Sequence, residues 1–143
     1  MGFPDRIERT VEVSKPPEKV WAALTTSEGL SAWFGQEATI ELRPGGPARM
    51  SWDGGHAVDM RVERVEEPNV FAFTWPIYGL PDDDPRRTYV EFTLEPVTAG
   101  TRLTVVETGF AQLSEEAYAQ AFEGNVRGWK SELGELVEYL DAA

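Results

Sequence analysis

The sequence predicts an α+β domain in which an antiparallel sheet is followed by one long helix. Two periodicities carry this prediction. Apolar and polar residues alternate, at the spacing of a strand, over residues 7–13 and through most of residues 37–107. From Ser114 to Leu140 the apolar spacing changes to three and four, which is the period of an amphipathic helix. A helix with such an apolar stripe needs a partner surface, and the inside of a curved sheet is the only large one that the sequence offers.

The first elements are a strand and two short helices. Ile7–Val13 alternates as a half-buried strand and ends at Ser14-Lys15-Pro16-Pro17. Proline suits the first turn of a helix because its missing N–H would have no partner there. The short helix that follows carries Val20, Trp21, Ala23 and Leu24 on one side. Ser27 is the expected N-cap of a second short helix, which carries Leu30, Trp33 and Phe34.

Six further strands complete the predicted sheet. Short turns join most of them, so that neighbouring strands pair antiparallel. The exception is the connection Pro76–Arg87, which holds three prolines and three consecutive aspartates and is expected to form a flap. No linker divides the chain, and we expect residues 1–143 to form a single domain. The expected strands are Ala38–Leu42, Ala48–Trp52, Ala57–Val65, Val70–Trp75, Thr88–Glu95 and Thr101–Thr108.

Composition excludes several classes of function. The 143 residues carry a net charge of −12, which disfavours a nucleic-acid partner because the phosphate backbone would be repelled. No apolar run is long enough to span a membrane. With one histidine and no cysteine, a zinc site is not expected, and we predict no metal and no cofactor. The absence of cysteine and of a signal-type N-terminus makes a cytoplasmic location the expectation.

Strand phase places three ionisable residues on the inner face of the sheet. Glu107 shares a face with Leu103 and Val105, His56 precedes the inward positions of its strand, and Arg9 is in phase with Ile7. Each has a second interpretation: a phase slip at the strand end for Glu107, a turn position for His56, and a head that reaches water for Arg9. A carboxylate inside the sheet would need hydrogen-bond donors or a proton, since an unpaired buried charge is very costly.

Glycines interrupt the predicted terminal helix at Gly124, Gly128 and Gly134. They could permit close approach of another backbone, leave room for a ligand, or only loosen the helix.

Several short motifs together resemble a known family. Val20-Trp21-Ala22-Ala23-Leu24-Thr25 after two prolines, then Trp33-Phe34, is similar to the opening of the START/polyketide-cyclase-like (SRPBCC) superfamily. Glu107-Thr108-Gly109-Phe110 and Gly128-Trp129 resemble its activator-of-heat-shock-chaperone-ATPase branch. The resemblance runs from about Ile7 to Leu140. It implies a helix-grip fold, in which a curved seven-stranded antiparallel sheet wraps around the long C-terminal helix and leaves an apolar cavity.

The functional hypothesis that follows is binding of a small, largely apolar ligand, lipid-like or aromatic, between the sheet and the terminal helix. For most of the aromatic candidates, packing in the core is the alternative. Two other functions stay open: a cyclase- or hydrolase-type enzyme with Glu107 as its acid/base, and a chaperone-interacting module. The partners to test are a small apolar molecule and a second copy of the chain as a homodimer. The candidate ligand-binding residues are Trp33, Phe34, Trp52, His56, Met60, Phe73, Trp75, Tyr78, Phe92, Glu107, Phe122, Asn125 and Trp129.

Overall fold

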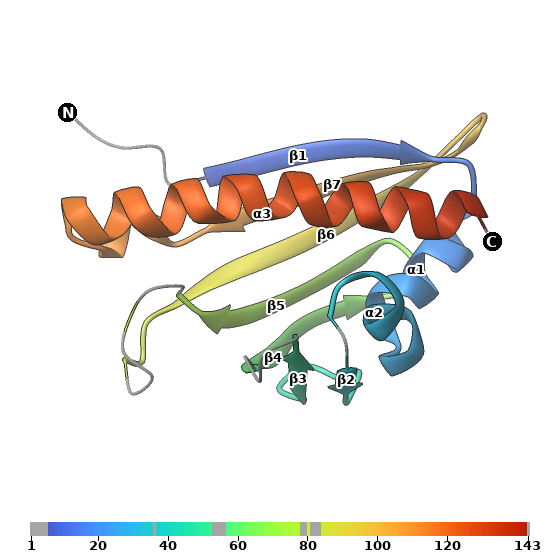
Figure 1. Cartoon of the computed structure of the whole chain (residues 1–143). Helices are drawn as coiled ribbons and strands as arrows, with labels where there is room; N and C mark the ends of the chain where they lie inside the picture. The colour runs from blue at the N-terminus through green and yellow to red at the C-terminus, as the bar shows by residue number, and fades with distance from the viewer. Residues whose placement is uncertain (1–5, 36, 53–56, 78–79, 81–83, 143) are drawn as a thin grey trace.

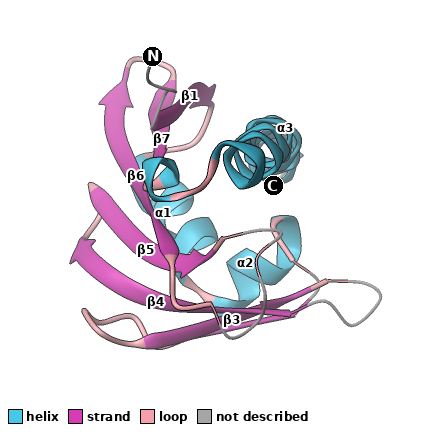
Figure 2. Ribbon diagram, turned by 90° about the vertical axis from the view of Figure 1, so that its left-hand side faces the viewer, coloured by secondary structure: helices cyan, strands magenta, loops and turns pink. Residues whose placement is uncertain are grey.

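A curved antiparallel sheet holds the long helix α3 on its concave side in the computed structural model (Figures 1 and 2). The structure describes residues 6–35, 37–52, 57–77, 80 and 84–142. In this part of the chain seven strands form one sheet in the order β1-β7-β6-β5-β4-β3-β2. The strands are β1 (Arg6–Val13), β2 (Glu37–Ile40), β3 (Pro47–Ser51), β4 (Ala57–Glu66), β5 (Val70–Pro76), β6 (Arg87–Val97) and β7 (Gly100–Thr108). This architecture confirms the predicted α+β helix-grip fold.

Two short helices follow β1 at one end of the sheet. α1 (Pro17–Thr25) begins at the predicted proline, and α2 (Ser27–Trp33) follows at once. The predicted N-cap of α2 is wrong by one residue, because the hydroxyl of Thr26 accepts the hydrogen bond from the Gly29 backbone N–H at 2.9 Å. A side chain at Gly29 would meet backbone atoms of Ala22 and Ala23 within 3 Å, so glycine permits the close contact between the two helices.

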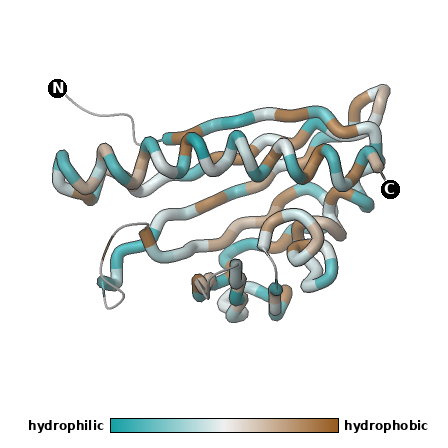
Figure 3. The backbone as a smooth tube through the Cα atoms, in the orientation of Figure 1, coloured by the Kyte–Doolittle hydropathy of each residue, from teal (hydrophilic) through white to brown (hydrophobic). Residues whose placement is uncertain are grey.

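The helix α3 spans Glu115–Ala142, after a short 3-10 turn η1 (Phe110–Gln112). Its buried residues are Tyr118, Ala121, Trp129, Leu133, Leu136 and Leu140. Apolar and polar positions alternate along it in Figure 3, as the sequence predicts for an amphipathic helix. The glycines Gly128 and Gly134 have no neighbouring atom within 4 Å of where a side chain would begin, so neither position serves close approach.

Residues on the inner faces of the strands form the core with α1, α2 and α3. Phe71 and Phe73 of β5 lie opposite Phe92 and Val90 of β6, and all four are buried. Arg9 lies opposite the buried Val105 but is exposed, which agrees with the second interpretation, a head that reaches water. β1 is an edge strand of the sheet, so a long side chain there can reach solvent past the edge.

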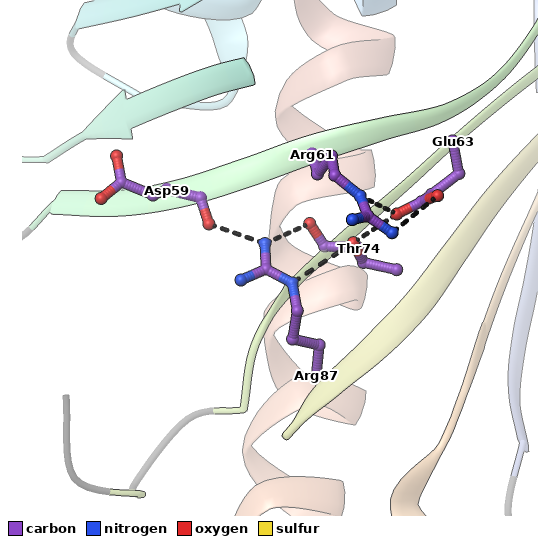
Figure 4. A network of polar contacts seen from close by, with 5 residues as sticks. All are labelled: Asp59, Arg61, Glu63, Thr74 and Arg87. Atoms are coloured by element: carbon purple, nitrogen blue, oxygen red, sulfur yellow. Dashed lines mark hydrogen bonds and ion pairs between the residues drawn. The ribbon is translucent and has the colours of Figure 1, made fainter. Parts of the chain in front are cut away.

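On the outer face, an arginine joins two strands that separate from each other (Figure 4). Pairing between β4 and β5 ends at Arg61 and Thr74, whereas β4 continues beside β3 to Ala57 and β5 beside β6 to Pro76. The Arg87 guanidinium donates to the backbone oxygens of Asp59 at 3.0 Å and Thr74 at 2.9 Å. Arg87 therefore links β4 and β5 at the point where their pairing ends.

Candidate functional site

The carboxyl group of Glu107 is the most deeply buried ionisable group in the described part of the chain. It lies on the inner face of β7 next to the core residue Val105, and its exposed fraction is 0%. The prediction that Glu107 points inward is therefore confirmed. Its position near the end of β7 sets it opposite Ile7 of β1 and Val90 of β6. Because the residues opposite Glu107 on both neighbouring strands are apolar, its carboxylate must be stabilised by hydrogen bonds from other side chains.

Four side chains, taken from the described residues, donate hydrogen bonds to Glu107. One oxygen, Oε1, accepts from the indole Nε1 of Trp129 and from the amide Nδ2 of Asn125, both at 2.9 Å. The other, Oε2, accepts from the indole Nε1 of Trp75 at 2.8 Å and the hydroxyl of Thr88 at 2.5 Å, and Nδ2 of Asn125 lies 3.0 Å away. The donors come from β5, β6 and α3. The carboxylate thus ties the terminal helix to the middle of the sheet.

This hydrogen bonding limits the chemistry available to Glu107. A carboxylate has about four lone-pair sites, and the contacts from β5, β6 and α3 occupy them. A substrate could exchange a proton with Glu107 only after displacing one of these donors. The geometry fits a carboxylate that orients Trp75, Asn125 and Trp129 better than a free acid/base.

The indoles that bind Glu107 belong to an aromatic cluster. The rings of Trp75 and Trp129 stack with centroids 5.6 Å apart, and Phe92 meets Trp129 edge-on at 5.7 Å. Phe34, from the end of α2, lies 6.0 Å from Trp75 and 5.8 Å from Trp129. Next to Glu107, the cluster fills the space between the sheet and α3. Phe34 is the ring of the cluster that comes from the side of α2.

An open groove lies on the other side of Phe34. It has a volume of about 630 Å³ and is formed where α2, the residue after β3 and the second half of α3 meet. One wall consists of Trp33, Phe34 and Trp52, and the other consists of Glu135, Glu138 and Tyr139. This volume lies in the range of small-molecule sites.

The indole N–H groups of the groove are already paired. Nε1 of Trp33 donates to the backbone oxygen of Ala23 at 2.7 Å, and Nε1 of Trp52 donates to that of Phe34 at 2.8 Å. Both rings are held in one orientation by these bonds. With the N–H groups engaged, the rings offer a ligand mainly apolar and π surface.

The acidic wall of the groove continues to Glu132, one turn before Glu135 on α3. The Glu132 side chain is half-buried, and its Oε2 atom is buried without a hydrogen-bond partner in the described residues. Burial raises the pKa of Glu132 to about 8, and the adjacent negative charge of Glu135 raises it as well. Glu132 is therefore mostly protonated at pH 7, and the negative charge of this wall comes from Glu135 and Glu138.

The structure places the predicted site residues in three groups. Trp33, Phe34 and Trp52 line the groove, although Trp33 and Phe34 are also buried in the core, and Trp75, Asn125 and Trp129 bind Glu107. Met60, Phe73 and Phe92 are buried core residues, and Phe122 packs against Phe110 at a ring distance of 5.3 Å. His56 and Tyr78 lie outside the described residues.

Thr88 and the acidic wall were not predicted from the sequence. Thr88 could have been found from strand phase, because it lies two residues before the inward-facing Val90. Glu132, Glu135 and Tyr139 also have helical spacing, but they form a polar stripe beside the apolar one, where solvated residues are the usual occupants.

Comparison with protein families gives one match over most of the chain. The model of the family described as "Activator of Hsp90 ATPase homolog 1-like protein" matches residues 14–141. Comparison with curated protein sequences finds no match.

Several solved structures share the fold over nearly the full chain. Protein MLL2253 from Mesorhizobium loti is 28% identical with a TM-score of 0.83, and the match covers 96% of this chain and 98% of that one. DynU16, a putative protein in the dynemicin biosynthetic locus, is 26% identical with a TM-score of 0.79 over 96% of this chain and 48% of its own. The Aha1 dimer from Colwellia psychrerythraea is 20% identical with a TM-score of 0.77, covers 95% and 96%, and supports the fold alone.

Proposed function

The chain belongs to the family of Activator of Hsp90 ATPase homolog 1-like proteins, and we propose that it binds a small, largely apolar molecule in the groove between α2 and α3. The observation that carries the proposal is the groove of about 630 Å³ with Trp33, Phe34 and Trp52 on one wall. Small-molecule sites have this size and are lined mainly by apolar and aromatic side chains. DynU16, a neighbour 26% identical, comes from a biosynthetic locus, which is consistent with a small molecule as the ligand.

The buried cluster behind the groove supports the same proposal. Phe34 forms part of the groove wall and also contacts the rings of Trp75 and Trp129. Those two indoles are fixed by Glu107, so the wall rests on a hydrogen-bonded core. A preformed wall lowers the entropy lost on binding.

The alternative of an enzyme with Glu107 as acid/base has less support. Glu107 is 0% exposed, and hydrogen bonds from four side chains occupy its oxygens. Glu107 does not line the groove, so a ligand bound there would not touch the carboxylate. A chaperone-interacting role stays a prediction from the sequence resemblance.

The proposed site can be tested with a neutral fluorescent probe, N-phenyl-1-naphthylamine, and a matched pair of variants. Tyr139 and Leu42 are both large apolar residues with an exposed fraction of 37%, but only Tyr139 lines this groove. We expect Tyr139→Ala to weaken probe binding by about threefold to tenfold and Leu42→Ala to leave it unchanged. Equal affinities of the two variants, or no binding by the unmodified chain, would contradict the proposal.

A homodimer remains a proposal for this chain. One fold neighbour, from Colwellia psychrerythraea, is described as a dimer. Sedimentation equilibrium across a concentration series would measure the mass, and a constant value of about 16 kDa would exclude the dimer. No helix in the described part of the chain is long and apolar enough to cross a membrane. The cytoplasmic location stays a prediction.

A further inference from the structure

We infer that the ligand of the groove between α2 and α3 is a small organic cation, in which an aromatic or aliphatic body carries an amine or quaternary ammonium group. The inference rests on the proposed function and names the chemical class of the ligand. It follows from the combination of the two walls, one aromatic and one acidic, that face the same space.

The aromatic wall can bind both parts of such a molecule. Trp33 and Phe34 are only 4% and 6% exposed and form the base of the groove, so Trp52 and Tyr139 present most of the aromatic surface to the body of the ligand. The faces of tryptophan and phenylalanine rings also attract cations within about 6 Å of the ring centre, and tryptophan does so most strongly. Because the N–H groups of Trp33 and Trp52 already donate to backbone oxygens, the ligand does not have to supply hydrogen-bond acceptors for these rings.

The acidic wall selects for positive charge. Glu135 and Glu138 line the groove, and none of the described residues that line it is basic. Glu132, one turn earlier, has a buried Oε2 without a partner in the described residues, and the negative charge of Glu135 acts on the same carboxyl. A cation bound beside Glu135 would compensate the charge of that carboxylate and so weaken one of the two causes that raise the pKa of Glu132.

A bare metal ion fits these observations less well than an organic cation. No group of three or more acidic or histidine side chains is arranged to hold a metal within the described ranges. Hard cations require several oxygen ligands, whereas half of this groove is aromatic. A volume of about 630 Å³ also exceeds what a single ion occupies and matches a small organic molecule.

The experiment compares two probes of the same shape and different charge. Benzyltrimethylammonium carries a permanent positive charge, and neopentylbenzene replaces its nitrogen with carbon and is neutral. NMR titration of the full chain follows the indole N–H signals of Trp33 and Trp52, which lie at the groove. We expect both probes to shift these signals, with the cation binding about tenfold more tightly.

Two double variants identify the source of the preference. Glu135→Gln with Glu138→Gln removes two charges from the groove. Glu8→Gln with Glu12→Gln removes two exposed charges from β1, at the sheet edge opposite the β2–β3 end. We expect the first pair to abolish the tenfold preference and the second pair to reduce it by less than about twofold, because Glu8 and Glu12 do not line the groove and salt screens their exposed charges. Thermal melting of both variants verifies that each one is folded.

The outcomes separate the inference from the function on which it rests. If both probes bind equally at Trp33 and Trp52, the groove is an apolar site and the organic cation is excluded. If the two double variants lose the preference equally, the attraction comes from the net charge, and the inference is again overturned. If neither probe shifts the two indole signals, the proposed function itself fails.

Discussion

Replacing Glu107 by glutamine tests whether the buried carboxylate holds α3 to the sheet. Glutamine keeps the shape but has one acceptor oxygen, and its amide nitrogen would face donors. If the amide oxygen takes the place of Oε1, the bonds from Asn125 and Trp129 remain. The new NH₂ group then lies against the N–H of Trp75, while the Thr88 hydroxyl can turn to accept.

The expected cost follows from these contacts. Hydrogen bonds to a charged group contribute about 1.5–3 kcal/mol each, roughly twice as much as neutral ones. The variant loses one such bond outright and weakens the remaining ones, which is partly offset because a neutral amide is easier to bury. We therefore expect the free energy of unfolding to fall by about 3 kcal/mol.

The assay is urea unfolding at pH 7, followed by tryptophan fluorescence and by far-UV circular dichroism. Glu95→Gln is the matched control, because Glu95 lies on β6 and its side chain is 60% exposed. We expect the control to change the free energy of unfolding by less than about 0.5 kcal/mol. A loss below about 1 kcal/mol for Glu107→Gln would refute the role assigned to the carboxylate.

Three further substitutions test other features of the fold. Gly134→Ala in α3 should raise the free energy of unfolding by about 0.5–1 kcal/mol in urea melts, because a side chain there meets no neighbouring atom; a decrease would show a contact that the structure lacks. Glu132 has a pKa of about 8 when folded against an ordinary 4.5, so the folded chain holds a proton that the unfolded chain has lost, and this group makes stability fall as pH rises between those values. Since the side chain is half-exposed, Glu132→Gln should stabilise by about 1–2 kcal/mol at pH 8.5 and by much less at pH 4.5, as measured by melts at both pH values; an equal effect at both would contradict the assignment. Arg87→Met removes donors to two backbone oxygens and should cost about 1–3 kcal/mol, whereas Arg6→Met at the exposed start of β1 should cost less than about 0.5 kcal/mol.

The fold could be predicted because its two periodicities are strong and separate. Alternation placed Glu107 on the inner face with Leu103 and Val105, and all three are buried. For Arg9 the same rule left two interpretations open, because phase fixes the face of a sheet but not whether an edge position is covered, and the structure shows the exposed one. The partners of Glu107 were beyond prediction as a set, since they lie 18 to 32 residues away along the chain on three different elements.

The groove was only partly predictable from the sequence. Trp33, Phe34 and Trp52 were expected to meet a ligand because they are aromatic and lie near the predicted cavity. The opposite wall was missed, because glutamates on a helix are usually solvated and only the packing of α2 beside α3 brings Glu135 opposite those rings. Tertiary arrangement, rather than local pattern, creates this acidic and aromatic pair of walls.

The hydrogen bonds to Glu107 also constrain the order in which the chain can fold. Their donors are Trp75, Thr88, Asn125 and Trp129. β5, β6 and β7 are translated before α3, so during synthesis the carboxylate has donors from the sheet but lacks those of the helix. Until α3 arrives, Glu107 is more stable in contact with water than sealed in apolar surroundings. Closure of the sheet interior therefore waits for residues 125 and 129 to emerge. A ribosome-bound chain that stops before them should remain sensitive to protease in β7.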